Sequence, residues 1–216
     1  AGKGTISHLL ADQLGWHLLD SGALYRVVGH ACLLEGVDWK DAPAVTEIAR
    51  HLDVEFTASK EGEVLVAYKK QDVSRAIRTE EGGLGASSVA VIPSVREALL
   101  ERQREMRRAP GLVADGRDMG TVVFPDAPLK FFLTASAEER AQRRYKQLIG
   151  KGESVSLPRL LEEIRERDER DSTRDVSPLV PAEDAIEIDS SATPIAEVFE
   201  LVMQNVRAKG FSGLPH

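Results

Sequence analysis

The chain has 216 residues, of which 42% are hydrophobic and 29% are charged, and its formal net charge at pH 7 is −7. This composition fits one compact domain with a full hydrophobic core and excludes an extensively disordered chain. The acidic balance counts against a protein that binds nucleic acid irrespective of sequence, because such proteins are usually basic. No apolar run approaches the ~20 residues of a membrane span, and no leader peptide opens the sequence. We therefore expect a cytoplasmic protein, with its single cysteine, Cys32, as a buried reduced thiol.

Apolar runs of strand length alternate along the chain with amphipathic stretches of helical length. This alternation predicts a series of βαβ units and a parallel sheet flanked by helices. We expect helices over residues 4–14, 21–34, 43–52, 77–90, 93–108, 137–149, 157–171 and 195–208. We expect strands over residues 16–19, 54–56, 64–68, 112–114, 129–133 and 186–188.

Two of the expected strands, 54–56 and 64–68, flank a polar stretch and alternate apolar with polar residues, which is typical of a β-hairpin. The hairpin interrupts the strand–helix rhythm. We therefore interpret residues 38–89 as an insert in a core formed by residues 1–37 and 90–216. A polar stretch, residues 150–156, joins the two helices expected on either side of it.

The sequence opens with Ala1-Gly2-Lys3-Gly4-Thr5, directly before an apolar helix. A phosphate-binding P-loop reads G-x-x-x-x-G-K-[ST] between a strand and a helix, where backbone N–H groups and the lysine hold phosphates and the hydroxyl binds Mg²⁺. Gly2 and Lys3 match this pattern, and the hydroxyl follows one residue late, as Thr5. The alternative is a chance GKGT at a flexible end. Because the first glycines and the preceding strand are absent, we expect roughly 15 more residues upstream in the intact protein.

A second signal is LLDSGALYR, residues 18–26. An apolar strand ends at Asp20 and a helix begins at Ser21, which places a helix N-terminus at the sheet edge where open α/β sheets bind ligands. By themselves, Asp20 and Ser21 are more typical of an ordinary helix cap, and Arg26 of a solvated surface charge.

The most specific signal is VADGRDMGTVVFPDAP, residues 113–128. A short buried strand ends at Asp115, and two opposite charges, Arg117 and Asp118, follow after one glycine. A charged cluster at the end of a buried strand indicates a ligand site rather than a solvated turn, because this edge of a parallel sheet is where ligands bind.

A fourth signal is ERDERDSTRDVSPLVP, residues 166–181. Arg167 and Asp171 lie four residues apart and so share a helix face, and Arg174 follows closely. Residues 140–174 contain ten Lys or Arg against seven Asp or Glu, although the whole chain is acidic. Ion pairing on solvated helices accounts for part of this excess. Phosphoryl transfer, however, depends on positioned positive charge, and arginine offers phosphate a fixed fork of donors.

Taken together, these segments resemble bacterial cytidylate kinases, a family of P-loop nucleoside-monophosphate kinases. The resemblance covers nearly the whole chain and rests on GKGT, LLDSGALYR, RTEE with ASSVA, PSVREALLERQR, ADGRDMGTVVFPDAPLKFFL and ERDERDSTRDVSPL, in family order. It implies an α/β fold with a P-loop NTPase-like parallel sheet flanked by helices, an inserted subdomain that binds the nucleoside monophosphate (NMP), and a short lid, which the polar stretch around residue 150 places at about residues 145–160. It also implies phosphoryl transfer from ATP to CMP or dCMP, with Mg²⁺ as cofactor, in a monomeric enzyme.

The resemblance assigns a role to each matching residue. The residues implied to bind the ATP phosphates are Gly2, Lys3, Gly4, Thr5, Arg143 and Arg144. Thr5 would also lie beside Mg²⁺. The residues implied to bind the acceptor nucleotide are Ser21, Arg26, Ser87, Arg96, Arg117, Asp118, Arg167, Asp171 and Arg174. The residues implied to spread the charge that develops during transfer are Lys3, Arg117, Arg167 and Arg174.

Within the acceptor group, the resemblance divides the roles further. Contact with the CMP phosphate falls to Arg26, Arg117 and Arg174. Contact with the sugar hydroxyls falls to Arg167 and Asp171. Contact with the cytosine falls to Ser87, Arg96 and Asp118. A carboxylate can accept from the amine of cytosine, whereas uracil would place a carbonyl against it, so Asp118 should favour CMP over UMP.

Two alternative functions remain open in the sequence. The P-loop fits equally a kinase whose acceptor is UMP, AMP or a non-nucleotide such as shikimate, although residues 113–128 and the hairpin insert favour cytidylate. From another class, an ATP-dependent nucleic-acid-binding module could use the basic helices, but the acidic net charge and the 5% aromatic content count against it.

Overall fold

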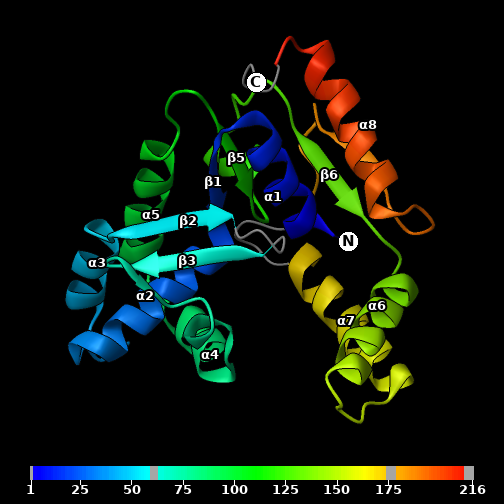
Figure 1. The fold of residues 1–216 in the computed structure, drawn as a ribbon. Coiled ribbons are helices and arrows are strands. Elements are labelled where there is room, and N and C mark those ends of the chain that lie inside the picture. Colours follow the sequence, from blue (N-terminus) through cyan, green and yellow to red (C-terminus); the bar gives the residue numbers. More distant parts are fainter. Residues whose placement is uncertain (1, 59–62, 174–178, 212–216) are drawn as a thin grey trace. The chain divides into compact units, whose positions relative to one another are not determined.

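The structure is a computed structural model that describes residues 2–58, 63–173 and 179–211, with the side chains of residues 171–173 outside the description. The chain divides into two compact units. Of the described residues, the N-terminal unit comprises Ser7–Gly116, and the C-terminal unit comprises residues 2–6 and those from Arg117 onward. Each unit contains a pair of parallel strands (Figure 1).

In the N-terminal unit, β1 (His17–Asp20) lies parallel to β5 (Leu112–Asp115), and the register pairs their last residues, Asp20 and Asp115. Helix α2 (Ser21–Glu35) begins directly after β1, without a loop. The Asp20 side chain accepts a hydrogen bond from the Ala23 N–H at 3.1 Å and so caps the helix. Gly36 ends α2 in the left-handed conformation, with φ 68°. The predicted strand end and helix start are therefore confirmed.

Helix α4 (Glu80–Ala90) packs closely on α2. A Cβ added to Gly29 of α2 would lie 2.7 Å from the carbonyl carbon of Gly85 in α4, closer than real side chains allow. The Trp39 indole N–H donates to the Gly29 carbonyl at 3.0 Å, and a Cβ on Gly85 would meet this indole ring at 2.9 Å. Glycines at both positions thus permit the two backbones to touch.

The core of this unit lies largely beneath α2. The α2 side chains Leu24, Val27, Val28 and Cys32 are fully buried. The prediction of a buried reduced thiol is confirmed, because Cys32 is a free cysteine with no exposed surface. Burial, with a smaller contribution from the Glu35 charge, raises the pKa of Cys32 to about 11.

The predicted insert contains a helix and an antiparallel sheet. Helix α3 (Ala42–Arg50) packs on α5 (Pro93–Glu105), and β2 (Val54–Ala58) pairs with β3 (Val64–Tyr68), which pairs with β4 (Gln71–Asp72). The β3–β4 turn consists of Lys69 and Lys70, both with positive φ, at 49° and 65°. Such left-handed pairs suit a tight hairpin but usually carry Asn or Gly, so two lysines do not predict this turn.

A polar cluster ties this sheet to the end of α2. The Tyr68 hydroxyl donates to the Glu35 carboxylate at 2.6 Å, and the Lys69 ammonium donates to the same oxygen at 2.7 Å. The pKa of Glu35 lies below its usual value chiefly because it accepts these two hydrogen bonds, first that of Lys69. Burial and the Glu35 contact raise the pKa of Tyr68 to about 12.

The expected helix over residues 77–90 is wrong in one respect. The segment divides into a 3₁₀-helix, η1 (Ala76–Arg78), and α4, which begins at Glu80. Thr79 between them is extended, with φ −73° and ψ 167°, and its hydroxyl accepts from the Gly82 N–H at 3.1 Å. Threonine here caps a new helix rather than continuing an old one. Helix α5 also ends at Glu105, earlier than the expected residue 108.

In the C-terminal unit, β6 (Phe131–Thr134) lies parallel to β7 (Ile186–Asp189). Figure 1 shows α8 (Ile195–Ala208) alongside β6, and Val198, Val202 and Val206 form its buried face. Helices α6 (Ala137–Gly150) and α7 (Leu157–Thr173) form an antiparallel hairpin. Helix α1 (Lys3–Leu14) begins in this unit and continues into the other.

A short π-helix, η2 (Met119–Val123), follows the Arg117-Asp118 pair. The main-chain carbonyl of Asp118 accepts from the N–H groups of Val122 and Val123, at 2.9 and 3.1 Å. No pattern in the sequence predicts this element. Single π-turns occur frequently at functional sites, where they re-aim neighbouring side chains.

The α/β class is confirmed by the alternating helices and the parallel strand pairs. None of the helices in the described ranges combines the length and apolarity that crossing a membrane requires.

Candidate active site

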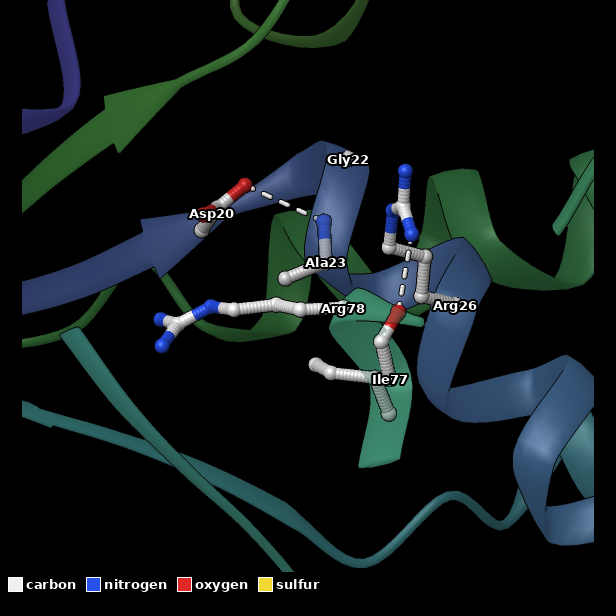
Figure 2. A pocket seen from close by; sticks show the side chains of 6 residues that line it. All are labelled: Asp20, Gly22, Ala23, Arg26, Ile77 and Arg78. Atoms are coloured by element: carbon white, nitrogen blue, oxygen red, sulfur yellow. Dashed lines mark hydrogen bonds between the residues drawn. The ribbon is translucent and has the colours of Figure 1, made fainter. Parts of the chain in front are cut away.

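The first part of the site is a cavity in the N-terminal unit, at the start of α2. Its volume is about 300 Å³, and its walls come from β1, α2 and η1. The lining residues are Asp20, Gly22, Ala23, Arg26, Ile77 and Arg78 (Figure 2). The position matches the sheet edge at which the sequence predicted a ligand, because α2 starts where parallel strands β1 and β5 both end.

Arg26 is the predicted acceptor-site residue that lines this cavity. Its Nη1 donates to the main-chain carbonyl of Ile77 at 2.8 Å, the contact drawn as a dashed line in Figure 2. The guanidinium also lies beside α4, since a Cβ added to Gly83 would lie 3.5 Å from Nη2. The Arg26 side chain is therefore fixed by a hydrogen bond to the main chain, and is not the freely solvated charge that the sequence also allowed.

Arg78 is a cavity residue that no motif in the sequence singled out. It is exposed, and its Nη2 donates to the main-chain carbonyl of Val64 in β3 at 2.6 Å. Figure 2 shows its side chain running past Ala23, away from Arg26. The RTEE motif, which begins at Arg78, contributed to the family resemblance. Nothing in its spacing showed that the arginine would reach the same cavity as Arg26.

The chemistry of this cavity suits a phosphate group. The first turn of α2 presents the main-chain N–H of Gly22, and the helix dipole favours an anion there, whereas the Ala23 N–H donates to Asp20. Arg26 and Arg78 add two permanent positive charges against the one carboxylate of Asp20. Part of that carboxylate is used by the cap, because its Oδ1 accepts from Ala23.

The other predicted residues of the N-terminal unit do not line the cavity. Ser21 is 7% exposed, in the first turn of α2. The Ser87 hydroxyl donates to the Gly83 carbonyl at 3.1 Å, within α4. Arg96 in α5 donates to the Ala90 carbonyl at 3.3 Å. The structure thus places Ser87 and Arg96 on adjoining helices, and their contact with the base stays a prediction.

The predicted P-loop residues lie at the start of α1. Gly2 has φ +75°, a conformation that favours glycine, and its carbonyl accepts from the Ile6 N–H at 3.0 Å. Lys3, Gly4 and Thr5 form the exposed first turn of the helix. The lysine and the hydroxyl are therefore at a helix N-terminus, the position in which a P-loop holds phosphates.

The Arg117-Asp118 pair is half-buried at the start of the C-terminal unit. The π-helix after it is supported by Lys130, whose side chain is 8% exposed. The Lys130 ammonium donates to the Pro125 carbonyl at 2.6 Å and to Asp184 at 2.8 Å. Its aliphatic chain fills the space beside Gly120, where an added Cβ would meet Lys130 Cδ at 3.0 Å. The loop that carries Asp118 is thus fixed by a buried lysine.

The arginines of the α6–α7 hairpin are mostly engaged with neighbouring groups. Arg143 donates to the Ser190 carbonyl at 2.9 Å and lies 3.3 Å from Glu139, while its buried Nη1 has no hydrogen-bond partner among the described residues. Arg144 is exposed and donates to Gln147 at 3.2 Å. These contacts leave the ATP-binding role of both arginines a prediction.

The hairpin itself is held by ion pairs between its helices. Arg140 of α6 binds both carboxylate oxygens of Asp168 in α7, with 2.8 Å from Nη1 to Oδ1, and Arg165 pairs with Glu138. The hydrogen bonds from Arg140 hold the pKa of Asp168 below its usual value. Arg167 is exposed on α7. The Asp171 side chain and Arg174 lie outside the described residues.

Comparison with known proteins agrees with these features. The mixed α/β fold, with parallel strands flanked by helices, is that of a P-loop nucleoside-monophosphate kinase. The family model for cytidylate kinase matches residues 1–208. The chain is 56% identical to cytidylate kinase from Stutzerimonas stutzeri (strain A1501), over 99% of this chain and 93% of that protein, and 59% identical to cytidylate kinase from Pseudomonas entomophila (strain L48), over 97% and 90%. The chain belongs to the cytidylate kinase family.

Proposed function

We propose that the protein phosphorylates CMP and dCMP with ATP, by direct in-line transfer of the γ-phosphoryl group. The observation that carries the proposal is the cavity at the start of α2, in which a helix N-terminus and two arginines suit the phosphate of an acceptor. Family membership supports cytidylate as that acceptor and disfavours UMP, AMP and shikimate-like acceptors and a nucleic-acid-binding module.

The residue roles follow the chemistry of each group. Arg26 would hold the acceptor phosphate, with Arg117 and Arg174, and Ser21 would lie beside the nucleotide. Asp118, Ser87 and Arg96 would contact the cytosine, and Arg167 and Asp171 the sugar. These assignments rest on the family resemblance, with support for Arg26 from its place in the cavity.

On the donor side, Gly2, Lys3, Gly4 and Thr5 would hold the ATP phosphates, because a helix N-terminus favours anions and the lysine adds positive charge. Arg143 and Arg144 would approach ATP from the hairpin, and Lys3, Arg117, Arg167 and Arg174 would spread the charge that develops in transfer. These groups stabilise charge, so the reaction needs no covalent enzyme intermediate.

Mg²⁺ is the proposed cofactor. The described residues contain no cluster of three or more His, Cys, Asp or Glu side chains that could hold a metal. We expect the ion to reach the site on substrate phosphates, since Mg²⁺ keeps several waters and needs few protein ligands. The exposed Thr5 hydroxyl at the start of α1 is a suitable oxygen donor. When bound, Mg²⁺ would neutralise charge on the transferred phosphates.

The proposed domain roles follow the secondary structure. Residues 38–89 would form the NMP-binding insert, and residues 145–160, which include the connection between α6 and α7, would form the lid. That the enzyme is a cytoplasmic monomer stays a prediction of the sequence, which light scattering and cell fractionation would test.

The direct test measures ADP release from Mg-ATP with CMP, dCMP, UMP and AMP in parallel. We expect turnover with CMP and dCMP and little with AMP. Failure with every monophosphate would remove the proposed function, together with every acceptor role proposed for these residues.

Base selectivity gives a sharper test at Asp118. Asp118→Ala should erode the preference for CMP over UMP and leave the KM for ATP unchanged, because only the base contact is lost. Asp118→Asn should do more and raise UMP turnover, since its amide can donate to the uracil carbonyl. Asp126→Ala, an exposed aspartate in the same loop, is the control. Equal selectivity in all variants would remove Asp118 from the base site.

A further inference from the structure

The corner between η1 and α4 holds the guanidinium of Arg26 through a main-chain atom. The Ile77 carbonyl, at the centre of η1, accepts from Arg26 Nη1 at 2.8 Å. A carbonyl cannot change charge or rotamer, so it fixes the guanidinium more rigidly than a flexible acidic side chain would. Because the guanidinium is planar, fixing Nη1 also fixes the directions of its remaining N–H donors.

Gly82 is what allows this carbonyl to lie where it does. A Cβ added to Gly82 would lie 2.2 Å from the Ile77 carbonyl oxygen and 2.6 Å from its carbon, and real Cβ atoms essentially never come within 3.0 Å of other atoms. Both atoms are backbone, so no side-chain rotation relieves the overlap. Any side chain at this position must therefore displace the group that holds Arg26.

The corner is fixed on both sides of this contact. The Thr79 hydroxyl accepts from the Gly82 N–H at 3.1 Å and donates to the Ala76 carbonyl at 2.8 Å, which joins η1 to α4. The Ile77 side chain is 1% exposed, and Arg78 is bound to β3 through the Val64 carbonyl. These contacts hold the Ile77 carbonyl in place independently of Arg26.

We infer that Gly82 is a positioning residue for the acceptor phosphate. It contacts no substrate itself. Its missing side chain lets the Ile77 carbonyl hold Nη1 of Arg26, which aims the other guanidinium donors into the cavity lined by both residues. This inference rests on the proposed function, since it requires Arg26 to bind the phosphate of the acceptor.

Gly82→Ala should raise the KM for CMP on the order of tenfold and leave the KM for ATP unchanged, because even a shift of about 1 Å in a positioning group is costly. The matched control is Gly83→Ala. It adds the same methyl group to the same helix, but at 3.5 Å from Arg26 Nη2, an ordinary contact distance, and not against the Ile77 carbonyl. Its KM for CMP should change less than about twofold.

Two further measurements separate positioning from a general loss of structure. The affinity for cytidine, which lacks the phosphate, should be unchanged in Gly82→Ala. In an Arg26→Ala background, Gly82→Ala should cause no further rise in the KM for CMP, because the group that it positions is gone. Additive effects of the two substitutions, or parallel losses of cytidine and CMP binding, would overturn the inference.

A second variant covers the case in which Gly82→Ala does not fold. Thr79→Val removes the two hydroxyl contacts of the corner and replaces threonine by a side chain of nearly the same size, so it should raise the KM for CMP about threefold, again only while Arg26 is present. If the unmodified enzyme turns over CMP and both variants match it, the inference fails alone. If the unmodified enzyme phosphorylates no monophosphate, the proposed function fails first.

Discussion

The corner around Arg26 and the α6–α7 hairpin both fix arginines, but they use different partners. In the corner, the partners are main-chain carbonyls, those of Ile77 for Arg26 and Val64 for Arg78. In the hairpin, the partner of Arg140 is the Asp168 carboxylate, and the partner of Arg165 is the Glu138 carboxylate. All four side chains are about a third exposed or more.

The chemistry of the partner decides which solution conditions affect each region. A carbonyl contact has no titrating acceptor and is made within the packing of α2, η1 and α4, so pH and salt should change it little. An exposed ion pair is screened by salt and is lost when its carboxylate is protonated. The contacts of the corner should therefore be insensitive to pH and salt, whereas those between α6 and α7 should weaken with acid and with salt.

The largest effect is expected from the fixed region. Arg26→Ala should lower kcat/KM for CMP on the order of 100-fold, about 2.7 kcal/mol, because a charge-assisted contact with phosphate is removed. The KM for ATP should stay unchanged. Arg50→Ala, which removes an exposed arginine paired with Glu47, is the control and should match the unmodified enzyme. Initial rates against CMP concentration measure both. A loss below threefold would show that Arg26 does not hold the phosphate.

A smaller effect is expected from acid in the hairpin. Because the pKa of Asp168 is lowered in the folded state, its pairing with Arg140 stabilises the protein above the unfolded pKa, near 4, and this contribution is lost as pH falls through the folded pKa. After allowance for solvent screening the contribution is about 1 kcal/mol or less.

Melting temperatures from pH 7 to pH 3 measure this contribution. Asp168→Asn should lower the melting temperature at pH 7, and its difference from the unmodified protein should shrink as the pH falls below about 4. Asp12→Asn, in the exposed face of α1, controls for the loss of one carboxylate. A constant difference between Asp168→Asn and the unmodified protein at every pH would show that the ion pair does not stabilise the hairpin.

A still smaller effect is expected from salt, which should weaken the contacts of the hairpin and leave those of the corner unchanged. At about 1 M salt the screening length is roughly 3 Å, so the ion pairs of α6 and α7 weaken while the carbonyl contacts of the corner do not. Amide hydrogen exchange should become a few-fold faster in α6 and α7 and stay unchanged in α2 and α4. Equal acceleration in both regions would contradict the distinction between them.

The smallest effect is expected at Cys32, in the buried core beneath α2. With its pKa raised to about 11 and no exposed surface, the thiol should not react measurably with an alkylating reagent at pH 8 until the protein unfolds. Mass spectrometry after incubation with iodoacetamide, with and without denaturant, checks this. Rapid labelling of the folded protein would show that this core opens locally.

Much of the fold could be predicted from sequence, because it depends on local patterns. The apolar spacing of residues 195–208 reproduces α8, and Asp20 followed by Ser21 marks the junction of β1 and α2. The break at Thr79 could not be predicted, because residues 77–90 read as a continuous helix. The π-helix of Met119–Val123 depends on a shift in hydrogen bonding that leaves no local signal.

The site was predicted less completely than the fold. The resemblance identified Arg26, which the structure brings into the cavity, but neither Arg78 nor the role of Gly82 followed from it. The place of Arg78 depends on a contact of η1 with α2, which is distant in sequence. The role of Gly82 depends on a sharp turn that brings it against Ile77. Glycines in a helix read as a weakness in helical propensity, whereas here they mark backbone contacts.

The contact between Gly29 and Gly85 has a mechanical consequence. Where two backbones touch, neither helix can slide or rotate without collision, because no side chain between them can change rotamer. Any motion of this region on binding a nucleotide must therefore carry α2 and α4, with Arg26 and Ser87, as one rigid body. The bending must occur at residues outside this helix pair, so the spacing between Arg26 on α2 and Ser87 on α4 is preserved when neighbouring segments move.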